Sequence, residues 1–380
     1  MKGTRHFFIE NKKFFVQDLS HANSFLVKSV PKPYKVSWNN YPQVQRVINN
    51  LVLKNKANLL LIDSNIYFLY KDGLNISKER IFIAQALESF KTLNGVIKLI
   101  DFLRGHNFTK GEQLIVVGGG IIQDVAAFVC ASYKRGVPWI YLPTTLLSMC
   151  DSCIGGKTGI NYKNVKNQLA LFSAPSQVII MPRFLETLKT KEINSGLGEI
   201  LKLYITGGRK FLDKYKNFVY SKKFNSKDCY KTLILDALAV KKAIVEKDEF
   251  ELDYRKSLNY GHTIGHVLEI MTNYKIPHGQ AVVAGIIVVN ELSFRRGLLK
   301  EKQKSELSAL LFDLLDINLF RGMKFDSFEA LLRKDKKNTG NIVNFIIIES
   351  IGWMKIIPLK IDKSLLREII TIIKAQFMIK

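Results

Sequence analysis

Short apolar runs rich in β-branched residues recur along the first half of the chain, and segments of helical periodicity separate them. The runs cover residues 59–62, 114–117, 139–142 and 178–181. They are apolar at every position rather than at every second one, which is typical of strands buried on both faces of a sheet. Alternation of such strands with helices predicts an α/β domain built on a largely parallel sheet.

The pattern of apolar and polar residues changes after about Leu188. From Ile193 onward helical periodicity dominates, and strand signals are confined to residues 342–348 and 353–357. No long linker marks the change near Thr190. We therefore expect two closely packed domains around a shared cleft, an α/β domain over residues 1–190 and a mainly α-helical domain over residues 191–380.

Composition narrows the possible partners and locations. A chain of 380 residues with 47 % apolar content can bury a large core. The net charge of +24 comes from Lys and Arg scattered along the chain, without a basic arm, so we expect no nucleic-acid partner. No apolar run reaches the length of about 18 residues that a membrane span needs. Four cysteines and no secretory segment favour a cytoplasmic protein.

A glycine-rich turn follows the predicted strand at residues 114–117. Gly118-Gly119-Gly120 leads directly into a predicted helix. Glycines allow a backbone to approach a pyrophosphate closely, and the first turn of a helix offers unpaired N–H groups. The segment is a candidate dinucleotide cradle, although a tight turn without a ligand has the same appearance.

The next loop carries an unusual density of polar groups. Thr144 and Thr145 precede Asp151, a glycine-flanked Lys157 and the pair Lys166-Asn167. Lysines among glycines are suited to an anionic group, and basic residues steer phosphate-bearing ligands. A flexible surface loop is the alternative interpretation.

Histidine is concentrated in one segment. Half of the six histidines lie between His262 and His278. His262 and His266 are four residues apart, which on a helix places both rings on one face about 6 Å from each other. The spacing suggests a metal site, while a solvated helix pair with unrelated histidines would show the same pattern.

Several motifs, in order from about Asp63 to about Gly352, resemble those of the 3-dehydroquinate synthase family of sugar phosphate cyclases. The family's Glu-x-x-Lys, GGGxxxD and PTTLLxxxDxxxGGKTxxN motifs match the stretches at 88–91, 118–124 and 143–161. Its GLAExxK, RxxLNxGHTxGH and DKK motifs match 196–202, 255–266 and 335–337.

The resemblance implies a Rossmann-like NAD-binding domain, a helical metal- and substrate-binding domain, and an active site in the cleft between them. It implies zinc, with Co²⁺ possible, held by Glu199, His262 and His278, and it assigns His266 to the substrate phosphate rather than to the metal. The implied NAD contacts are Asp63, Glu88, Lys91, Gly119, Gly120, Asp124, Thr144, Thr145 and Thr187.

The implied substrate is 3-deoxy-D-arabino-heptulosonate 7-phosphate, which the family converts to 3-dehydroquinate and phosphate in the shikimate pathway of aromatic amino acid biosynthesis. NAD would oxidise the substrate transiently, phosphate would leave, NADH would return the hydride, and an intramolecular aldol step would close the carbocycle. A homodimer is expected, with Arg135 reaching the neighbouring subunit's site. The other implied substrate contacts are Asp151, Lys157, Lys166, Asn167, Lys202, Lys241, Arg255, Asn259, His266 and Lys336.

The chain departs from the family pattern at several positions. Gln123 and Ala127 replace glycines of the cofactor turn, and the usual proline and glycine before Lys166-Asn167 are absent. Gln123 could narrow the approach to the pyrophosphate or point outward from the first helical turn, and we expect the outward orientation. Gln280 replaces the glutamate of the family's HGEAV motif. This replacement puts in question a contact that would orient a metal ligand.

Three other functions remain open at this point. A sister cyclase could use another sugar phosphate, although Lys241, Asn259 and His266 match the dehydroquinate synthase residues. A metal-dependent polyol dehydrogenase of the same superfamily would bind NAD and zinc but would not need the phosphate-binding lysines. An inactive relative could bind NAD or a partner protein.

Overall fold

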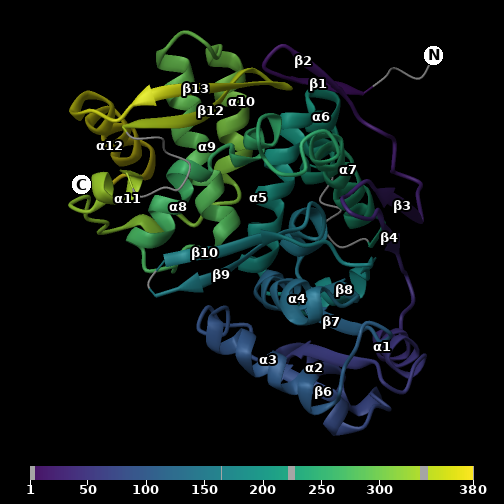
Figure 1. The fold of residues 1–380 in the computed structure, drawn as a ribbon. Helices are drawn as coiled ribbons and strands as arrows, with labels where there is room; N and C mark the ends of the chain where they lie inside the picture. Colours follow the sequence, from purple (N-terminus) through teal and green to yellow (C-terminus); the bar gives the residue numbers. More distant parts are fainter. Residues whose placement is uncertain (1–4, 164, 221–226, 334–340, 380) are drawn as a thin grey trace. The chain divides into compact units, whose positions relative to one another are not determined.

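A computed structural model describes residues 5–163, 165–220, 227–333 and 341–379. The chain forms two compact units (Figure 1). The sheet unit comprises Leu19–Leu188, and the helical unit comprises Met1–Asp18 with Lys189–Lys380. The expected boundary near Thr190 lies close to this division, but the expected assignment of the first residues to the α/β domain differs from it.

The N-terminal strands belong to the helical unit because they complete its sheet. β1 (His6–Ile9) pairs with β13 (Trp353–Lys360) in parallel and with β2 (Lys12–Phe15) antiparallel. Arg5 also donates to Asp236, a fully buried carboxylate, with 3.0 Å between Nη1 and Oδ1. Strands of four residues are too short to show a clear hydrophobic period, so the sequence did not reveal this pairing.

The sheet unit is built on seven strands in the order β3-β4-β11-β8-β7-β5-β6. All neighbouring strands run parallel except β3 and β4. The four buried strands predicted from the sequence are confirmed as β5, β7, β8 and β11. The strands are β3 (Ser24–Val27), β4 (Tyr34–Trp38), β5 (Leu59–Asp63), β6 (Ile81–Ala84), β7 (Leu114–Gly118), β8 (Trp139–Pro143) and β11 (Gln177–Ile180).

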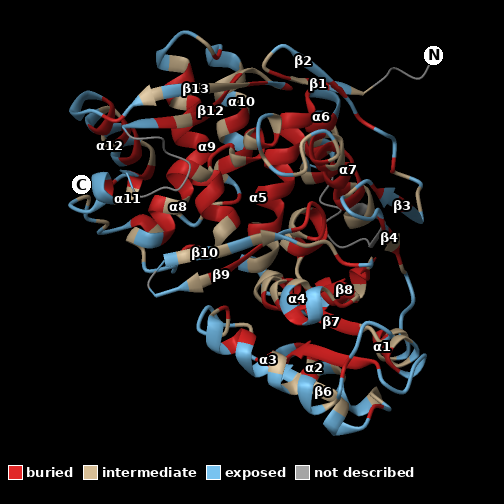
Figure 2. Cartoon of the chain, viewed as in Figure 1, coloured by how far each residue is buried: buried red, intermediate tan, exposed pale blue. Residues whose placement is uncertain are grey.

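The centre of this sheet is its core. β5, β7 and β8 are buried at every position, and Figure 2 shows β7 in red. Burial on both faces explains the uninterrupted apolar runs. A two-stranded hairpin, β9 (Lys157–Tyr162) and β10 (Val165–Phe172), also belongs to the unit. Its helices are α1 (Val44–Leu53), α2 (Ser64–Tyr70), α3 (Leu93–Gly105) and α4 (Gly120–Ser132).

The helical unit confirms the helix-rich second half and both of its predicted strands. Its sheet has the order β12-β13-β1-β2, and β12 (Ile342–Ser350) pairs antiparallel with β13. Among the described residues, its helices are α5 (Thr190–Gly207), α6 (Arg209–Tyr220), α7 (Lys227–Val245), α8 (His262–Met271), α9 (His278–Arg295), α10 (Glu301–Phe312), α11 (Phe328–Arg333) and α12 (Lys363–Phe377).

Glycines let α5 and α8 approach α9 at backbone distance. A Cβ added at Gly279 would lie 1.8 Å from the carbonyl oxygen of Ser195, and one at Gly285 would lie 1.9 Å from that of Gly261. The N–H of Gly279 also donates to Ser195 Oγ at 3.0 Å. Any larger side chain at these positions would force the helices apart, so glycine fixes their spacing.

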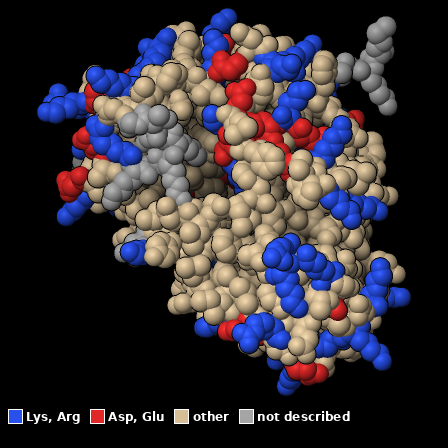
Figure 3. All heavy atoms as spheres, viewed as in Figure 1, with Lys and Arg blue, Asp and Glu red and all other residues tan. Residues whose placement is uncertain are grey.

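The basic side chains of the surface do not form one continuous patch on the face drawn in Figure 3, where Lys and Arg lie in several separate groups. Among the described helices, none combines the length and the apolar content that crossing a membrane requires.

We predict that Gly279→Ala lowers the free energy of unfolding by about 3 kcal/mol or more, because the new methyl group would overlap the Ser195 backbone. Gly105→Ala is the control, since a Cβ at this helical position meets no atom within 4 Å. It should leave stability unchanged or raise it by up to about 1 kcal/mol, because alanine favours a helix over glycine. Urea denaturation measures both variants, and equal unfolding midpoints would show that the close approach is not required.

Candidate functional site

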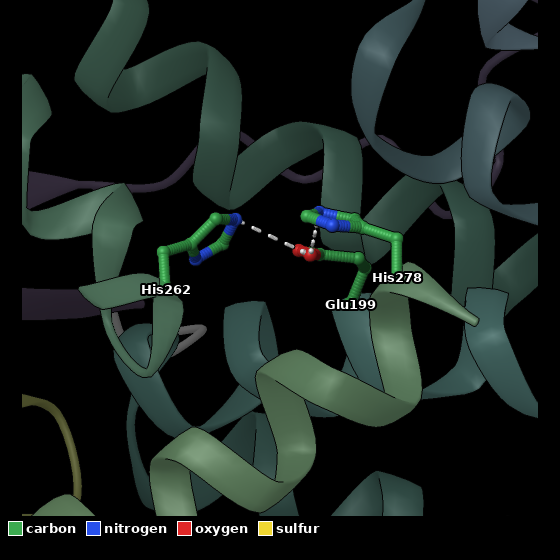
Figure 4. A group of neighbouring side chains, drawn as sticks. All are labelled: Glu199, His262 and His278. Atoms are coloured by element: carbon green, nitrogen blue, oxygen red, sulfur yellow. Dashed lines mark ion pairs between the residues drawn. The ribbon is translucent and has the colours of Figure 1, made fainter. Parts of the chain in front are cut away.

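Three side chains from three helices converge in the helical unit (Figure 4). Glu199 lies on α5, His262 begins α8 and His278 begins α9. Nε2 of His262 is 3.6 Å from Glu199 Oε1, and Nε2 of His278 is 3.4 Å from the same oxygen. One ligand atom from each residue lies within 4.8 Å of the other two. We call these three residues the metal-ligand cluster.

The opposite edges of both imidazoles face hydrogen-bond acceptors. His262 Nδ1 is 3.3 Å from the carbonyl oxygen of Tyr260, and His278 Nδ1 is 3.1 Å from Glu269 Oε2. A proton on each Nδ1 satisfies these acceptors and leaves each Nε2, on the side that faces Glu199, as the atom that a metal ion would contact. This is how metal-bound histidines are usually oriented in proteins.

The donor chemistry therefore fits a divalent metal. Two imidazole nitrogens and one carboxylate oxygen form a set that zinc accepts while keeping positions open for other ligands. Partial removal of His278 from water would lower its pKa, but the carboxylates of Glu269 and Glu199 outweigh this effect and raise the pKa to about 10. The strong field of these carboxylates favours a cation at this position.

Glu269 was not anticipated from the sequence. It lies on α8 three residues after His266, so helical spacing could have placed it on the same face. Gln280, which stands where the family has a glutamate, instead accepts a hydrogen bond from the backbone N–H of Asp316 at 3.4 Å. The carboxylate that contacts His278 is thus supplied by α8.

His266 lies beside the metal-ligand cluster rather than within it. Its ring centroid is 5.4 Å from that of His262, and it forms an overlapping potential metal group with Glu269 and His278. The prediction that His262 and His266 share a helical face is confirmed by their common position on α8. The two groups share His278, whose Nε2 faces Glu199 and whose Nδ1 faces Glu269.

The helical unit buries several cationic side chains, and one of them pairs with Glu199. Lys202 lies on the same face of α5, with 2.5 Å between its Nζ and Glu199 Oε2. Lys202, Lys241 and Arg255 are all buried. Buried lysine and arginine side chains are rare without a partner or a function.

The segment before α8 positions two more predicted residues. Asp248 accepts backbone N–H groups of Leu252, Asp253 and Arg255. Burial would raise the pKa of Asp248, but these hydrogen bonds, led by that of Arg255, lower it overall. The turn carries Asn259, which donates to Glu251 Oε1 at 2.8 Å.

The predicted cofactor residues of the sheet unit gather at the carboxyl ends of its parallel strands. Asp63 ends β5, Gly119 follows β7 and Thr144 follows β8. The N–H of Thr144 donates to the carbonyl oxygen of Gly118 at 3.1 Å, which joins two of these strand ends. Ligands of open α/β sheets bind at this edge. Thr145 and Gly120 continue the same loops, and Gly120 begins α4.

Ion pairs connect further predicted residues of the sheet unit. Lys91 pairs with Asp124, and Lys166 Nζ lies 3.0 Å from Glu88 Oε1. Burial raises the pKa of Asp124 despite the opposing effect of Lys91. Burial also acts to raise the pKa of Glu88, but Lys166 and the hydrogen bond from Asn161 lower it overall.

The expectation that Gln123 points outward is wrong. Gln123 is buried, its Nε2 donates to the Ser152 carbonyl oxygen at 2.7 Å, and its Oε1 accepts from Ser152 Oγ at 2.6 Å. Ser152, at the end of the helical turn Ser148–Ser152, holds the amide inward because its carbonyl oxygen accepts and its hydroxyl donates. Gln123 therefore holds the backbone beside Asp151.

Three further predicted residues are exposed in the sheet unit, and a fourth lies outside the described residues. Lys157 is exposed at the start of β9, and Thr187 is exposed at the end of a 3₁₀ helix, Pro182–Thr187. Arg135 is exposed after α4, with a left-handed φ of 61°. Lys336 lies outside the described residues.

Comparison with known proteins gives a family for this arrangement. Residues 81–195 match the sequence model for the N-terminal part of 3-dehydroquinate synthase, and residues 196–338 match the model for its C-terminal part. The chain belongs to the 3-dehydroquinate synthase family. The matched segments contain the metal-ligand cluster and most of the predicted cofactor residues.

Curated relatives extend the match. The 3-dehydroquinate synthase of Sulfurovum sp. (strain NBC37-1) is 36 % identical over 284 residues, which is 74 % of this chain and 80 % of the relative. The bifunctional 3-dehydroquinate synthase/phosphatase of Fusobacterium nucleatum is 35 % identical over 313 residues, or 82 % of this chain. The match spans only 45 % of that longer relative.

Solved structures share the fold of this 3-dehydroquinate synthase family member. A 2-deoxy-scyllo-inosose synthase complexed with carbaglucose-6-phosphate, NAD⁺ and Co²⁺ has a TM-score of 0.78 at 20 % identity, covering 93 % of this chain and 99 % of that one. The 2-epi-5-epi-valiolone synthase of Streptomyces hygroscopicus subsp. jinggangensis 5008, with NAD⁺ and Zn²⁺ bound, has a TM-score of 0.72 at 21 % identity, with coverages of 93 % and 99 %.

We predict that Glu269→Gln weakens zinc binding by about 10- to 100-fold, because His278 loses the carboxylate that orients its ring. Competition with a chromophoric chelator measures the dissociation constant. Glu291→Gln on α9 is the control, because Glu291 pairs with Arg295 and Lys304 rather than with the metal-ligand cluster. Zinc affinities that are the same for wild type and Glu269→Gln would remove Glu269 from the site.

Proposed function

We propose that this protein is a cytoplasmic 3-dehydroquinate synthase that uses NAD and zinc. It converts 3-deoxy-D-arabino-heptulosonate 7-phosphate to 3-dehydroquinate and phosphate, a phosphate-eliminating lyase reaction of aromatic amino acid biosynthesis. The observation that carries the proposal is the metal-ligand cluster with Lys202 bound to the same carboxylate. Membership of the family and the NAD, metal and sugar-phosphate complexes of structural relatives support it.

Bound NAD supplies a hydride acceptor and donor for the substrate's C4 carbon, and bound zinc polarises the oxygen on that carbon. Glu199, His262 and His278 would hold the metal, while Asp63, Gly119 and Thr144 at the strand ends, together with Glu88, would contact the cofactor.

The cations of the chain bind the anionic ends of the substrate in this proposal. Lys157, Asn167, His266 and Lys336 bind the phosphate, while Arg255, Lys202, Lys241 and Asn259 hold the carboxylate and hydroxyls. Charge-assisted contacts of this kind are typically worth about 1.5–3 kcal/mol each, and they align the phosphate for departure. The burial of Lys202 and Arg255 keeps their charges in fixed positions.

The direct test is turnover by the purified protein with NAD and zinc. We predict stoichiometric release of phosphate and dehydroquinate over many cycles with no net rise in NADH absorbance, because the hydride returns to the product within each turnover. Steady NADH accumulation from a polyol would support the dehydrogenase alternative instead. Turnover of a different sugar phosphate, with none of the heptulosonate phosphate, would favour a sister cyclase.

We further propose a homodimer in which Arg135 contacts the substrate phosphate of the neighbouring subunit. Arg135→Ala and Lys157→Ala should each lower kcat/KM by roughly tenfold to a few hundredfold. The two residues would serve a given site from opposite subunits, so mixed dimers of the variants should regain activity at one intact site. Verified mixed dimers without recovered activity would refute the role across subunits.

A further inference from the structure

The hairpin of β9 and β10 is irregular where it carries two predicted phosphate-binding residues. Its register shifts between Val165 and Leu169, and Lys166 and Asn167 lie within this bulge. Asn167 has a φ of 51°. This is the left-handed region of backbone conformation, which residues other than glycine, asparagine, aspartate and histidine seldom occupy. Bulges beside functional sites turn side chains in directions that a regular strand would not allow.

Asn161 contacts the bulge and the opposite segment at once. Its Oδ1 accepts the backbone N–H of Asn167 at 3.0 Å, and its Nδ2 donates to Glu88 Oε2 at 2.6 Å. Its own backbone N–H donates to the carbonyl oxygen of Lys91 at 2.9 Å. The other carboxylate oxygen of Glu88 contacts Lys166. Asn161 therefore connects residues assigned to the cofactor with residues assigned to the phosphate.

A glycine makes room for this arrangement. A Cβ added at Gly159 would lie 2.8 Å from Cβ and 3.0 Å from Oδ1 of Asn167. The absence of a side chain at Gly159 allows Asn167 to fold back over β9 in its left-handed conformation. The bulge is thus shaped from two sides, by a hydrogen bond from Asn161 and by free space at Gly159.

We propose that Asn161 is a positioning residue that fixes the Lys166-Asn167 bulge against Glu88 and so couples the cofactor-binding residues to the phosphate-binding residues. The proposal rests on the proposed function for the identity of the two ligands. Asparagine suits this role because its amide offers a donor and an acceptor in one plane. Aspartate at position 161 would keep the acceptor for Asn167 but place a second carboxylate against Glu88.

Alanine and aspartate at position 161 separate the contact with Asn167 from the contact with Glu88, because alanine removes both and aspartate keeps only the first. In Asn161→Ala, hydrogen exchange at the Asn167 amide should accelerate by at least about threefold, and the Kd of NAD should rise by about three- to tenfold. The KM for the heptulosonate phosphate should rise by a similar factor while kcat stays within about twofold. In Asn161→Asp, exchange at Asn167 should stay near the wild-type rate while NAD binding weakens at least as much.

Gln168→Ala is the matched control, since Gln168 is exposed on the same bulge. It should leave amide exchange at Asn167, the Kd of NAD and the KM unchanged. The proposal is overturned if Asn161→Ala leaves the exchange rate or both binding constants within about twofold of wild type. It is also overturned if Asn161→Asp binds NAD as wild type does.

A separate assay distinguishes failure of the proposed function from failure of the role proposed for Asn161. If the wild-type protein releases no phosphate from the heptulosonate phosphate, the proposed function fails. The exchange rate at Asn167 and the NAD titration then decide the positioning role of Asn161 by themselves, because neither measurement requires turnover.

Discussion

The backbone contacts of α9 with α5 and α8 are the constraint on which the metal-ligand cluster depends. Gly279 touches the Ser195 backbone and Gly285 touches that of Gly261. His278 immediately precedes one of these contacts, and His262 immediately follows another. Because helix backbones cannot shift by even a methyl group here, the two imidazoles and Glu199 are held at distances that suit one metal ion.

Rigidity in the sheet unit has a different source. Parallel strands bring Asp63, Gly119 and Thr144 to one edge, and the more distant Glu88 and Lys166 are joined to each other by an ion pair. The β9–β10 hairpin, which carries residues predicted to bind phosphate, lies outside the seven-stranded sheet, so its bulge is held by hydrogen bonds of Asn161 rather than by the ladder of that sheet. Asn161 supplies the bonds that the sheet does not.

The sequence predicted features that depend on local patterns or on family motifs. Uninterrupted apolar runs identified the central strands, and the family resemblance named the three residues that the structure brings together as the metal-ligand cluster. The N-terminal strands, the inward Gln123 and the contact of Glu269 with His278 were not foreseen. Each depends on a partner distant in sequence or on a choice of rotamer, which no local periodicity records.

The central claim is that Glu199, His262 and His278 hold the metal ion. Anomalous diffraction at the zinc edge from zinc-loaded crystals tests it most directly. We expect one peak about 2.0–2.2 Å from a Glu199 oxygen and from Nε2 of both histidines. A peak instead between His266, Glu269 and His278 Nδ1 would contradict the account, because the metal would then occupy the overlapping group.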